Sequence, residues 1–374
     1  MRHLRKVTTL RADATVPIRP LPRATRPQAG TVQVHCANVD LFATRLAQGG
    51  AVLAPMAGYS DAPFRRLCRE QGSAWAVTEM VSARALARGD QRSLLIGAPY
   101  PGEPDLVIQL FASDPGEAAA AAVRLQERYA PVAFDLNMGC PVRKVVHKGC
   151  GVELMARPEL ARAIVAAVRD ASGLPVSTKM RLGKDEVRLA EAADAVVDGG
   201  ASLVAVHGRT GAQKYEGSAD WDPIVELAQR LPVPVVGSGD VTDPATFRSR
   251  RAQGVGVMIA RGALGRPWIF AEVRGAPAPA WPDVAATIVR HAQLQADWYG
   301  EARGVRALRG HLERYVAPHR EGRALRSALV RATTVADVAA QLASTLSGPA
   351  RKAVSGRAII HASPVGAGAG GPVV

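Results

Sequence analysis

Eight short apolar segments recur along the middle of the chain, separated by longer amphipathic stretches, and this alternation limits the possible fold more than any other feature. Most of the segments are continuous apolar runs, which is typical of parallel strands buried on both faces. The predicted strands are Val52–Pro55, Ala76–Glu79, Leu106–Leu110, Ala133–Asn137, Val176–Lys179, Leu203–His207, Val235–Gly237 and Val257–Ala260. Eight strands alternating with helices specify a closed barrel or a doubly wound sheet. No G-x-G-x-x-G motif follows the first strand, so we predict an α/β fold of the (β/α)8 TIM barrel type.

Helical patterns lie between the strands, for example at Pro158–Ala171, Glu186–Val197 and Asp243–Gln253. After Trp281 no further strand pattern occurs, and the pattern becomes entirely helical. The helices expected there are Val284–Gly300, Gly304–Pro318, Gly322–Ala332 and Val335–Ser347. We therefore predict four regions: an N-terminal extension over residues 1–48, a barrel over 49–275, a small helical domain over 282–347 and a tail over 348–374.

The two ends of the chain have the composition of disordered segments. The first 48 residues interleave basic residues with prolines, which cannot nucleate a core, and the tail is rich in Gly, Ala and Pro. The extension either contacts RNA or is an inert addition, including one that results from a start codon assigned too early. We favour the inert addition.

Charge suggests a polyanionic partner without proving one. The formal net charge of the 374 residues is +14, which suits RNA but also suits a genome with high arginine usage. Hydrophobic residues make up 48% of the chain, so global disorder is excluded. No secretory pattern or apolar run of membrane-spanning length is present, so we expect a reduced, cytoplasmic protein that is a monomer.

Polar side chains follow most of the predicted strands at the point where each strand ends. In a TIM barrel the carboxyl ends of the strands form the mouth at which the chemistry occurs. Polar groups buried there need partners, and a large polar cofactor would supply partners to all of them. The residues at these strand ends, polar and apolar together, are Pro55, Met56, Ala57, Glu79, Gln109, Asn137 followed by Cys140, Lys179, His207, Ser238, Gly239, Asp240, Ala260, Arg261 and Gly262.

Glycine-rich sequences follow the seventh and eighth strands, at 237–240 and 261–265. Loops seven and eight are the usual phosphate site of this fold, because glycines let backbone N–H groups approach an anion. Arg261 adds positive charge at the same place. We predict a phosphate group of the cofactor here.

Lys179 interrupts an otherwise apolar strand, which is costly unless its ammonium faces an electron-rich partner. In a flavin site this ammonium would stabilise negative charge on the pyrimidine side of the reduced ring, and the Gln109 amide would bond to the same ring edge. The alternative is an ion pair with Glu79 or Asp135.

Cys140 lies on a loop constrained by Gly139 and Pro141 at the predicted mouth, where a thiol acts as an acid, a nucleophile or a metal ligand. Arg143, Lys144 and Lys148 follow closely and are expected to favour thiolate, which complicates a role as general acid. A zinc site made with His147 and Cys150 fits no standard spacing and lacks a fourth ligand, so we predict no metal. Cys36 and Cys68 look ordinary, and Cys68 is expected to pack on the inner face of a helix.

Seven motifs in a fixed order resemble the tRNA-dihydrouridine synthases from about Val52 to about Ala340. Each motif alone is unspecific, whereas their order and completeness are specific. They are Ala54–Gly58, Gln109–Phe111, Asn137–Pro141 with Lys144-Val145, Lys179–Arg181, His207–Thr210, Gly237–Asp240 and Gly262–Trp268. The segment from His291 to His311 resembles that family's tRNA-binding helical domain.

This resemblance implies FMN as cofactor, NADPH as reductant and tRNA as substrate. It implies that Cys140 donates the proton to C5 of uracil after hydride transfer to C6. FMN would be held by Pro55, Met56, Ala57, Gln109, Lys179, His207, Ser238, Gly239, Asp240, Ala260 and Arg261. We assign contacts with the RNA to Asn137, Lys144, Arg209, Arg309 and His311. His311 and Tyr315, one helical turn apart, either stack on the RNA or pack the helical bundle.

Four positions depart from the family pattern. Ser238 replaces a common Asn and Ala260 a usual Gly, and backbone contacts should tolerate both. Cys150 stands where Ala or Ser is usual. Gly211 replaces a frequent Arg, which weakens one expected phosphate contact.

Two other classes of function remain open at this stage. One is a flavin barrel acting on a free pyrimidine-like metabolite, as a dihydroorotate dehydrogenase does; the basic helical domain argues against it. The other is a non-catalytic RNA-binding barrel, which predicts colourless protein.

Overall fold

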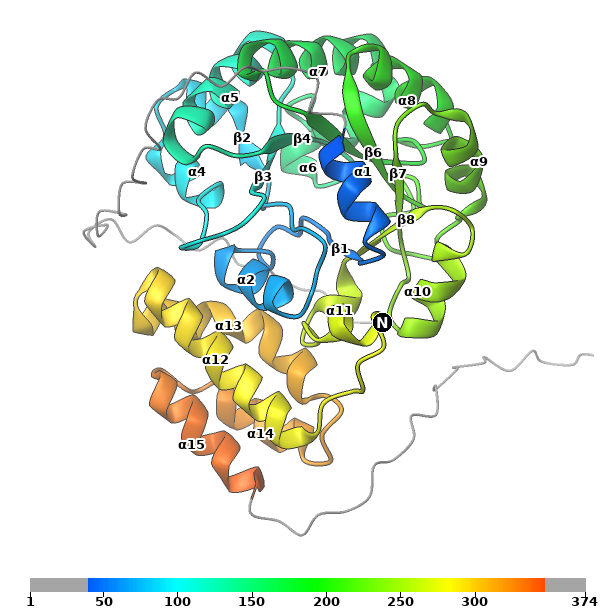
Figure 1. The fold of residues 1–374 in the computed structure, drawn as a ribbon. Coiled ribbons are helices and arrows are strands. Elements are labelled where there is room, and N and C mark those ends of the chain that lie inside the picture. Colours follow the sequence, from blue (N-terminus) through cyan, green and yellow to red (C-terminus); the bar gives the residue numbers. More distant parts are fainter. Residues whose placement is uncertain (1–39, 347–374) are drawn as a thin grey trace, which may run out of the picture.

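Eight parallel strands surrounded by helices make up the first part of the computed structural model, which describes residues 40–346 (Figure 1). The strands are β1 Val52–Leu53, β2 Val81–Ser82, β3 Val107–Phe111, β4 Ala133–Met138, β5 Val176–Arg181, β6 Ala201–His207, β7 Val235–Ser238 and β8 Gly256–Ile259. They pair in the order β1-β8-β7-β6-β5-β4-β3-β2. This pairing of the first strand with the last is the topology of a TIM barrel, so the predicted fold is confirmed.

The barrel closes through the residues just before β2. Leu53 of β1 bridges to Ala76, and Val77 bridges to Val107 of β3. The predicted strand Ala76–Glu79 therefore occupies the second barrel position only as isolated bridges. The regular strand β2 begins later, at Val81, and pairs with the end of β3.

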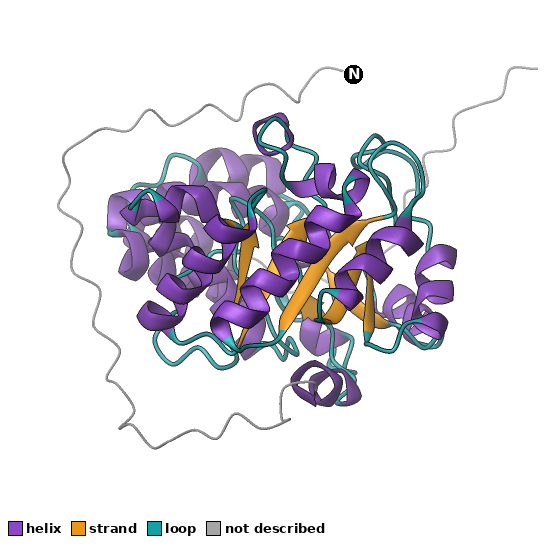
Figure 2. Ribbon diagram, turned by 90° about the horizontal axis from the view of Figure 1, so that it is seen from above, coloured by secondary structure: helices purple, strands orange, loops and turns teal. Residues whose placement is uncertain are grey.

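Helices cover the outside of the sheet, as the view from above shows (Figure 2). Several begin at a side-chain cap that satisfies a free backbone N–H; for example, Asp243 accepts a hydrogen bond from the Thr246 N–H at 2.8 Å, directly before Pro244. The barrel helices are α2 Ala62–Glu70, α3 Ala83–Ala87, α4 Gln91–Ile96, α5 Pro115–Tyr129, α6 Arg143–Val146, α7 Pro158–Ser172, α8 Leu189–Asp198, α9 Asp222–Arg230, α10 Pro244–Arg251 and α11 Ile269–Glu272, with 3₁₀ helices η1 Gly151–Ala156 and η2 Arg261–Ala263.

The N-terminal extension is shorter than predicted, because residues 40–47 form the helix α1 Asp40–Ala47. Phe42 on this helix is 1% exposed and packs on Trp75, with ring centroids 5.5 Å apart. Burial of this aromatic ring explains why the segment is ordered despite its neighbours' composition. The disorder expected for residues 1–39 and 348–374 falls outside the described residues.

The barrel interior has two layers of opposite character, both set by the period of two along a strand. The lower layer lies toward the amino ends of the strands, in contact with α1. It is apolar and contains Val52, Val107, Ala133, Leu203, Ala205, Val236 and Met258. Two residues further along each strand, the same face carries the upper layer, which contains Gln109, Asp135, Asn137, Lys179, Arg181, His207 and Ser238. The alternation that fills the lower core therefore also points the polar groups into the mouth.

The last four helices form a helical domain with its own apolar core, packed beside α2 and α11 (Figure 1). They are α12 Trp281–Tyr299, α13 Glu301–Val316, α14 Gly322–Leu329 and α15 Val335–Leu346. Ile288, Val305, Leu308, Leu312 and Leu329 are each completely buried in this core. The predicted helices are thus present, and α12 begins three residues before the expected Val284.

Candidate active site at the carboxyl ends of the strands

The strand register brings the predicted site residues side by side. Asn137 pairs with Lys179 and Arg181 pairs with His207. His207 in turn pairs with Ser238. Because all these positions lie on the interior face, the sequence prediction of a polar mouth matches their placement.

A buried chain of hydrogen bonds runs across three strands at this mouth. The Gln109 amide Nε2 donates to Asp135 Oδ2 at 2.7 Å, and Gln109 Oε1 accepts from Asn137 Nδ2 at 2.9 Å. Ser177 donates to the other Asp135 oxygen at 2.6 Å. Burial raises the pKa of Asp135 to about 6. The Gln109 amide is therefore largely committed to protein partners and fixes the orientation of Asn137.

Lys179 lies beside this chain of hydrogen bonds. Within residues 40–346 its ammonium makes no hydrogen bond and no ion pair. Burial, together with the charge of Arg181, lowers the pKa of its ammonium to about 8. Asp135 acts on it at longer range, but no ion pair with Asp135 or Glu79 is formed. The alternative explanation of Lys179 as half of an ion pair is thus wrong, and its donors are available to a ligand.

His207 is held neutral among positive charges. Burial and the nearby cations Lys179, Arg181, Arg209 and Arg261 lower its pKa to about 2. Its Nε2 lies 3.2 Å from Nη1 of Arg209, which can only donate, so Nε2 accepts and Nδ1 carries the proton. A neutral imidazole in a cationic setting suits an electron-rich ligand.

Arg209 does not face the mouth, contrary to its assignment as an RNA contact. It is 1% exposed, and its guanidinium donates to the carbonyls of Glu216 and Gly217 and to Asp240 Oδ2 at 2.7 Å. Its remaining nitrogen, Nη1, lies 3.2 Å from His207 Nε2, so four of the five guanidinium N–H groups have protein partners, and the burial of the side chain keeps the fifth from a phosphate outside the protein. The assignment is wrong: Arg209 stabilises the loop after β6.

Asp240, which is predicted to be a cofactor ligand, pairs with two arginines, and its contact with a cofactor stays a prediction. It bonds Arg209 and also Arg261, at 3.0 Å. Although burial alone would raise the pKa of Asp240, the hydrogen bonds from Arg209 and the Ala219 N–H outweigh it and lower this pKa. Arg261 remains 47% exposed in its side chain, so it can turn further donors toward an anion at the mouth.

The turn between β7 and α10 requires its glycine. Gly239 has φ of 127°, and a Cβ there would lie 2.4 Å from the Cβ of Ala219. Asp240 follows with φ of 55°. This compact turn lets the backbone come close to a ligand beside Ser238, as expected of a phosphate loop.

Cys140 lies half-buried on the loop after β4, with its backbone N–H bonded to Asn137 Oδ1 at 3.0 Å. Burial raises the pKa of the thiol above its ordinary value, despite opposing effects of the Val142 N–H, Arg181 and Lys179. The prediction that Arg143, Lys144 and Lys148 favour thiolate is wrong, because these side chains are exposed and point to solvent. The thiol therefore stays protonated, as a proton donor must.

The loop that carries Cys140 is fixed by the segment ten residues later. Cys140 O accepts from the Val152 N–H at 3.1 Å. Gly151 has φ of 66°, and a Cβ there would lie 2.6 Å from the same carbonyl oxygen. Cys150 is buried, and its Sγ donates to the Lys148 carbonyl at 3.5 Å, so this side chain packs within the loop.

The turn after β1 carries the predicted ligands Pro55, Met56 and Ala57. Met56 N–H donates to Ser60 Oγ at 2.7 Å. Gly58 N–H donates to a carboxylate oxygen of Glu79. Burial raises the pKa of Glu79 to about 7. The sequence predicts Glu79 as a strand end and as an alternative partner of Lys179, and the structure shows that it holds this turn.

Of the other predicted RNA contacts, Asn137 is bonded to Gln109 and its contact with RNA stays a prediction. The remaining three divide into two groups. Lys144 and Arg309 are exposed. His311 is 2% exposed and packs on Phe64, with ring centroids 4.5 Å apart. Its assignment to RNA is wrong, because it lies on the stripe of α13 that includes Leu308, Leu312 and Tyr315 of the domain core.

Other kinds of site find no support among the described residues. Residues 40–346 contain no group of three or more His, Cys, Asp or Glu side chains placed to hold a metal ion, including the set around Cys140. In the same part of the chain, no helix has the length and hydropathy needed to cross a membrane.

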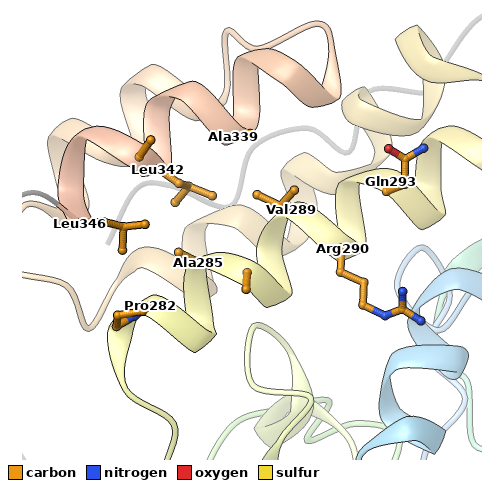
Figure 3. A pocket seen from close by; sticks show the side chains of 10 residues that line it. Pro282, Ala285, Val289, Arg290, Gln293, Ala339, Leu342 and Leu346 are labelled. Atoms are coloured by element: carbon orange, nitrogen blue, oxygen red, sulfur yellow. The ribbon is translucent and has the colours of Figure 1, made fainter.

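An apolar groove of about 530 Å³ lies away from the strand ends, between α12 and α15 (Figure 3). Pro282, Ala285, Val289, Leu342 and Leu346 line it. Arg290 at its edge points toward α2 and pairs there with Glu70, at 2.6 Å. The groove offers no nucleophile or acid, so the barrel mouth is the candidate active site.

Comparison with known proteins identifies a family. The family model described as dihydrouridine synthase matches residues 52–350. The probable tRNA-dihydrouridine synthase of Mycobacterium tuberculosis is 39% identical over 311 residues, covering 76% of this chain and 78% of that protein. tRNA-dihydrouridine synthase B of Xanthomonas axonopodis pv. citri is 37% identical over 301 residues, covering 76% and 88%. Among solved structures, an old yellow enzyme homologue from Zymomonas mobilis has a TM-score of 0.41 at 13% identity, covering 61% of this chain and 89% of that one.

Proposed function

The chain belongs to the dihydrouridine synthase family, and we propose from this membership that it reduces uridine in the D-loop of tRNA to dihydrouridine, with FMN as cofactor and NADPH as reductant. The observation that carries the proposal is a protonated thiol at the barrel mouth, beside a lysine that has no protein partner. Reduction of the uracil C5–C6 bond needs a proton donor, which the thiol of Cys140 provides. It also needs a positive charge beside the reduced cofactor, which Lys179 provides. NADPH and tRNA are separate molecules that react with the protein, so the experiment below tests the identity of both.

The donors at the mouth fit FMN. Lys179 has unused N–H groups and a depressed pKa, and a partner that gains negative charge on reduction would raise that pKa again by favouring the ammonium. His207 offers its Nδ1–H to the ring, and Gln109 offers the one amide N–H that Asp135 does not take. The Gly239 turn and Arg261 together suit the phosphate. When bound, FMN supplies the hydride for C6 of uracil.

Cys140 is the group that supplies the proton for C5. Its raised pKa keeps the proton on sulfur at neutral pH. The Asn137 amide holds the loop through the Cys140 N–H, so the thiol has a fixed position above the mouth. Arg181 reinforces this by donating from Nε to the Gly139 carbonyl at 2.8 Å. General acid catalysis of this kind contributes about 10²–10⁴-fold to the rate.

The exposed arginines of the helical domain suit the RNA backbone. Arg303, Arg306 and Arg309 on α13 are all exposed. The target base must leave its stack to reach a barrel mouth, so the protein holds the RNA by shape and phosphate rather than by sequence. Strong salt dependence of binding follows from such contacts.

In vitro reduction of unmodified tRNA tests the function. Purified protein should turn yellow with FMN, oxidise NADPH and convert D-loop uridine to dihydrouridine, detected by mass spectrometry of digested tRNA. Free uridine at the same concentration serves as the matched substrate and should react far more slowly. Failure to take up FMN supplied in excess would refute the flavin, and equal turnover of free uridine would indicate a metabolite reductase instead.

A further inference from the structure

The turn after β1, residues 56–61, is held from two sides. From the barrel, Glu79 accepts from the Gly58 N–H, and Arg65 donates to the Ser60 carbonyl at 3.4 Å. Within the turn, the N–H groups of Tyr59 and Ser60 both donate to the Met56 carbonyl at 2.9 Å. On the other side, the turn is held by helices α12 and α13, more than 200 residues later in the chain.

Helix α12 reaches the turn through Asp61. One carboxylate oxygen, Oδ1, caps α2 by accepting from the Phe64 N–H at 3.1 Å. The other, Oδ2, accepts from Gln295 Nε2 at 2.9 Å and from the Tyr299 hydroxyl at 3.2 Å. Both donors belong to the helical domain, so every partner of Oδ2 lies outside the barrel.

Helix α13 reaches the same turn through Tyr59. The His311 ring lies edge-on to the Tyr59 ring at 5.5 Å, and the Arg314 guanidinium lies over it at 5.5 Å. His311 also makes a hydrogen bond to the Tyr59 backbone. A Cβ at Gly310 would lie 3.3 Å from the Tyr59 ring, which shows how closely α13 approaches.

We propose that Gln295 and Tyr299 are positioning residues that fix the cofactor-facing turn after β1 by holding Asp61. The helical domain would then have two tasks: its exposed arginines contact RNA, and its buried polar face sets the position of Met56 and Ala57. The consequence for the cofactor rests on the proposed function, whereas the consequence for the turn does not.

The physical reason is the cost of a buried acceptor without donors. Loss of both donors leaves the buried Asp61 Oδ2 without a hydrogen-bond partner, which is unfavourable. Burial already raises the pKa of Asp61, so without these donors the carboxyl either moves or takes up a proton, and in both cases Oδ2 no longer holds the turn to α12. Local opening of the turn is therefore expected to become easier by about tenfold, without global unfolding.

Hydrogen exchange of the apoprotein tests this directly. In the double variant Gln295→Ala/Tyr299→Phe, the amides of residues 58–60 should exchange about tenfold faster than in wild type. Arg290→Ala is the matched control, because it removes the ion pair with Glu70 at the same domain interface but does not touch the turn. Exchange at these amides should stay at the wild-type rate in the control.

The second readout is flavin binding. The Kd for FMN should rise about fivefold or more in the double variant, with altered flavin absorbance, and remain unchanged in Arg290→Ala. Wild-type exchange in a folded double variant would overturn the proposal, and so would faster exchange with an unchanged Kd. If wild type binds no FMN, the proposed function fails while the exchange result still decides the role of Gln295 and Tyr299. Should the double variant not fold, Tyr299→Phe alone must show a smaller increase, of about two- to threefold, in exchange.

Discussion

The lower and upper layers of the barrel are built by the same strands, yet they obey different rules. Along β6, Leu203 and Ala205 fill the lower layer, and His207 stands two residues later on the same face. Along β3, Val107 precedes Gln109 in the same way. The lower layer is stabilised by burial alone. The upper layer buries groups that are unfavourable without partners, so its composition reflects the ligand rather than the fold.

The pKa shifts of the acid and the bases in the upper layer have the same main cause, which is burial. Burial raises that of Asp135 to about 6 and lowers those of Lys179 to about 8 and His207 to about 2. Each shift favours the neutral form, which is what desolvation does. A polar or anionic ligand that bonds to these buried groups therefore offsets the cost of their desolvation. Four substitutions test this division between the layers.

The largest expected effect separates chemistry from stability. Cys140→Ala should lower the rate of dihydrouridine formation by about 10²–10⁴-fold, because the proton for C5 loses its donor. The Kd for FMN and the urea midpoint should stay at their wild-type values. Cys150→Ala is the matched control in the same loop and should keep its activity. Near-wild-type product formation by Cys140→Ala, measured by mass spectrometry of tRNA, would remove Cys140 from the mechanism.

The lower layer should show the opposite pattern. Leu203 is 2% exposed, and Leu203→Ala should reduce the free energy of unfolding by about 2–5 kcal/mol through lost burial and a cavity. Flavin affinity of the folded fraction should be unchanged, since His207 keeps its place on the strand. Urea denaturation and FMN titration of the same preparation check both parts. A large loss of affinity would show that the layers are not independent.

The sequence predicts the barrel and its polar mouth because both depend on local periodicity. Apolar runs mark the strands, and the period of two assigns Gln109, Asn137, Lys179 and His207 to one face. The interruption before β2 is not visible in this way, because a bridge differs from a strand only in its pairing. Helix α1 was missed since one buried Phe42 outweighs the composition around it.

The wrong predictions of site residues concern the groups that a side chain contacts at its far end. Arg209 and His311 were placed on the RNA because of their charge and their motif. The structure places Arg209 against Asp240, 31 residues later, and His311 against Phe64 in another domain. Which residue such a side chain contacts depends on tertiary packing, and no local pattern identifies that partner. For His311 a signal existed, because Leu308, Leu312 and Tyr315 on the same stripe of α13 predict burial.

A smaller effect should appear when the upper layer is made apolar. Because the pKa of Lys179 falls from 10.5 to about 8 on folding, the unfolded chain binds more protons between these values, and stability rises with pH there. Lys179→Met should therefore be more stable than wild-type apoprotein at pH 7, by on the order of 2 kcal/mol, with the difference shrinking toward pH 10.5. Urea midpoints at pH 7 and 9 measure this. If Lys179→Met is less stable than wild type at pH 7, the ammonium stabilises the mouth of the apoprotein. In either case, Lys179→Met should bind FMN more weakly than wild type.

The smallest effect concerns Glu79, at the border between the mouth and the helical domain. Burial, reinforced by the nearby carboxyl of Asp61, raises its pKa from 4.5 to about 7. The folded protein thus binds the extra proton, and stability from this group is present below pH 4.5 and lost as pH rises through 7. Glu79→Gln keeps an oxygen to accept from the Gly58 N–H but cannot ionise, so it should be more stable than wild type by about 1–2 kcal/mol at pH 8 and by much less at pH 5.5. An advantage that is equal at both pH values, in urea denaturation of the apoprotein, would show that the carboxyl is already ionised when it holds the turn.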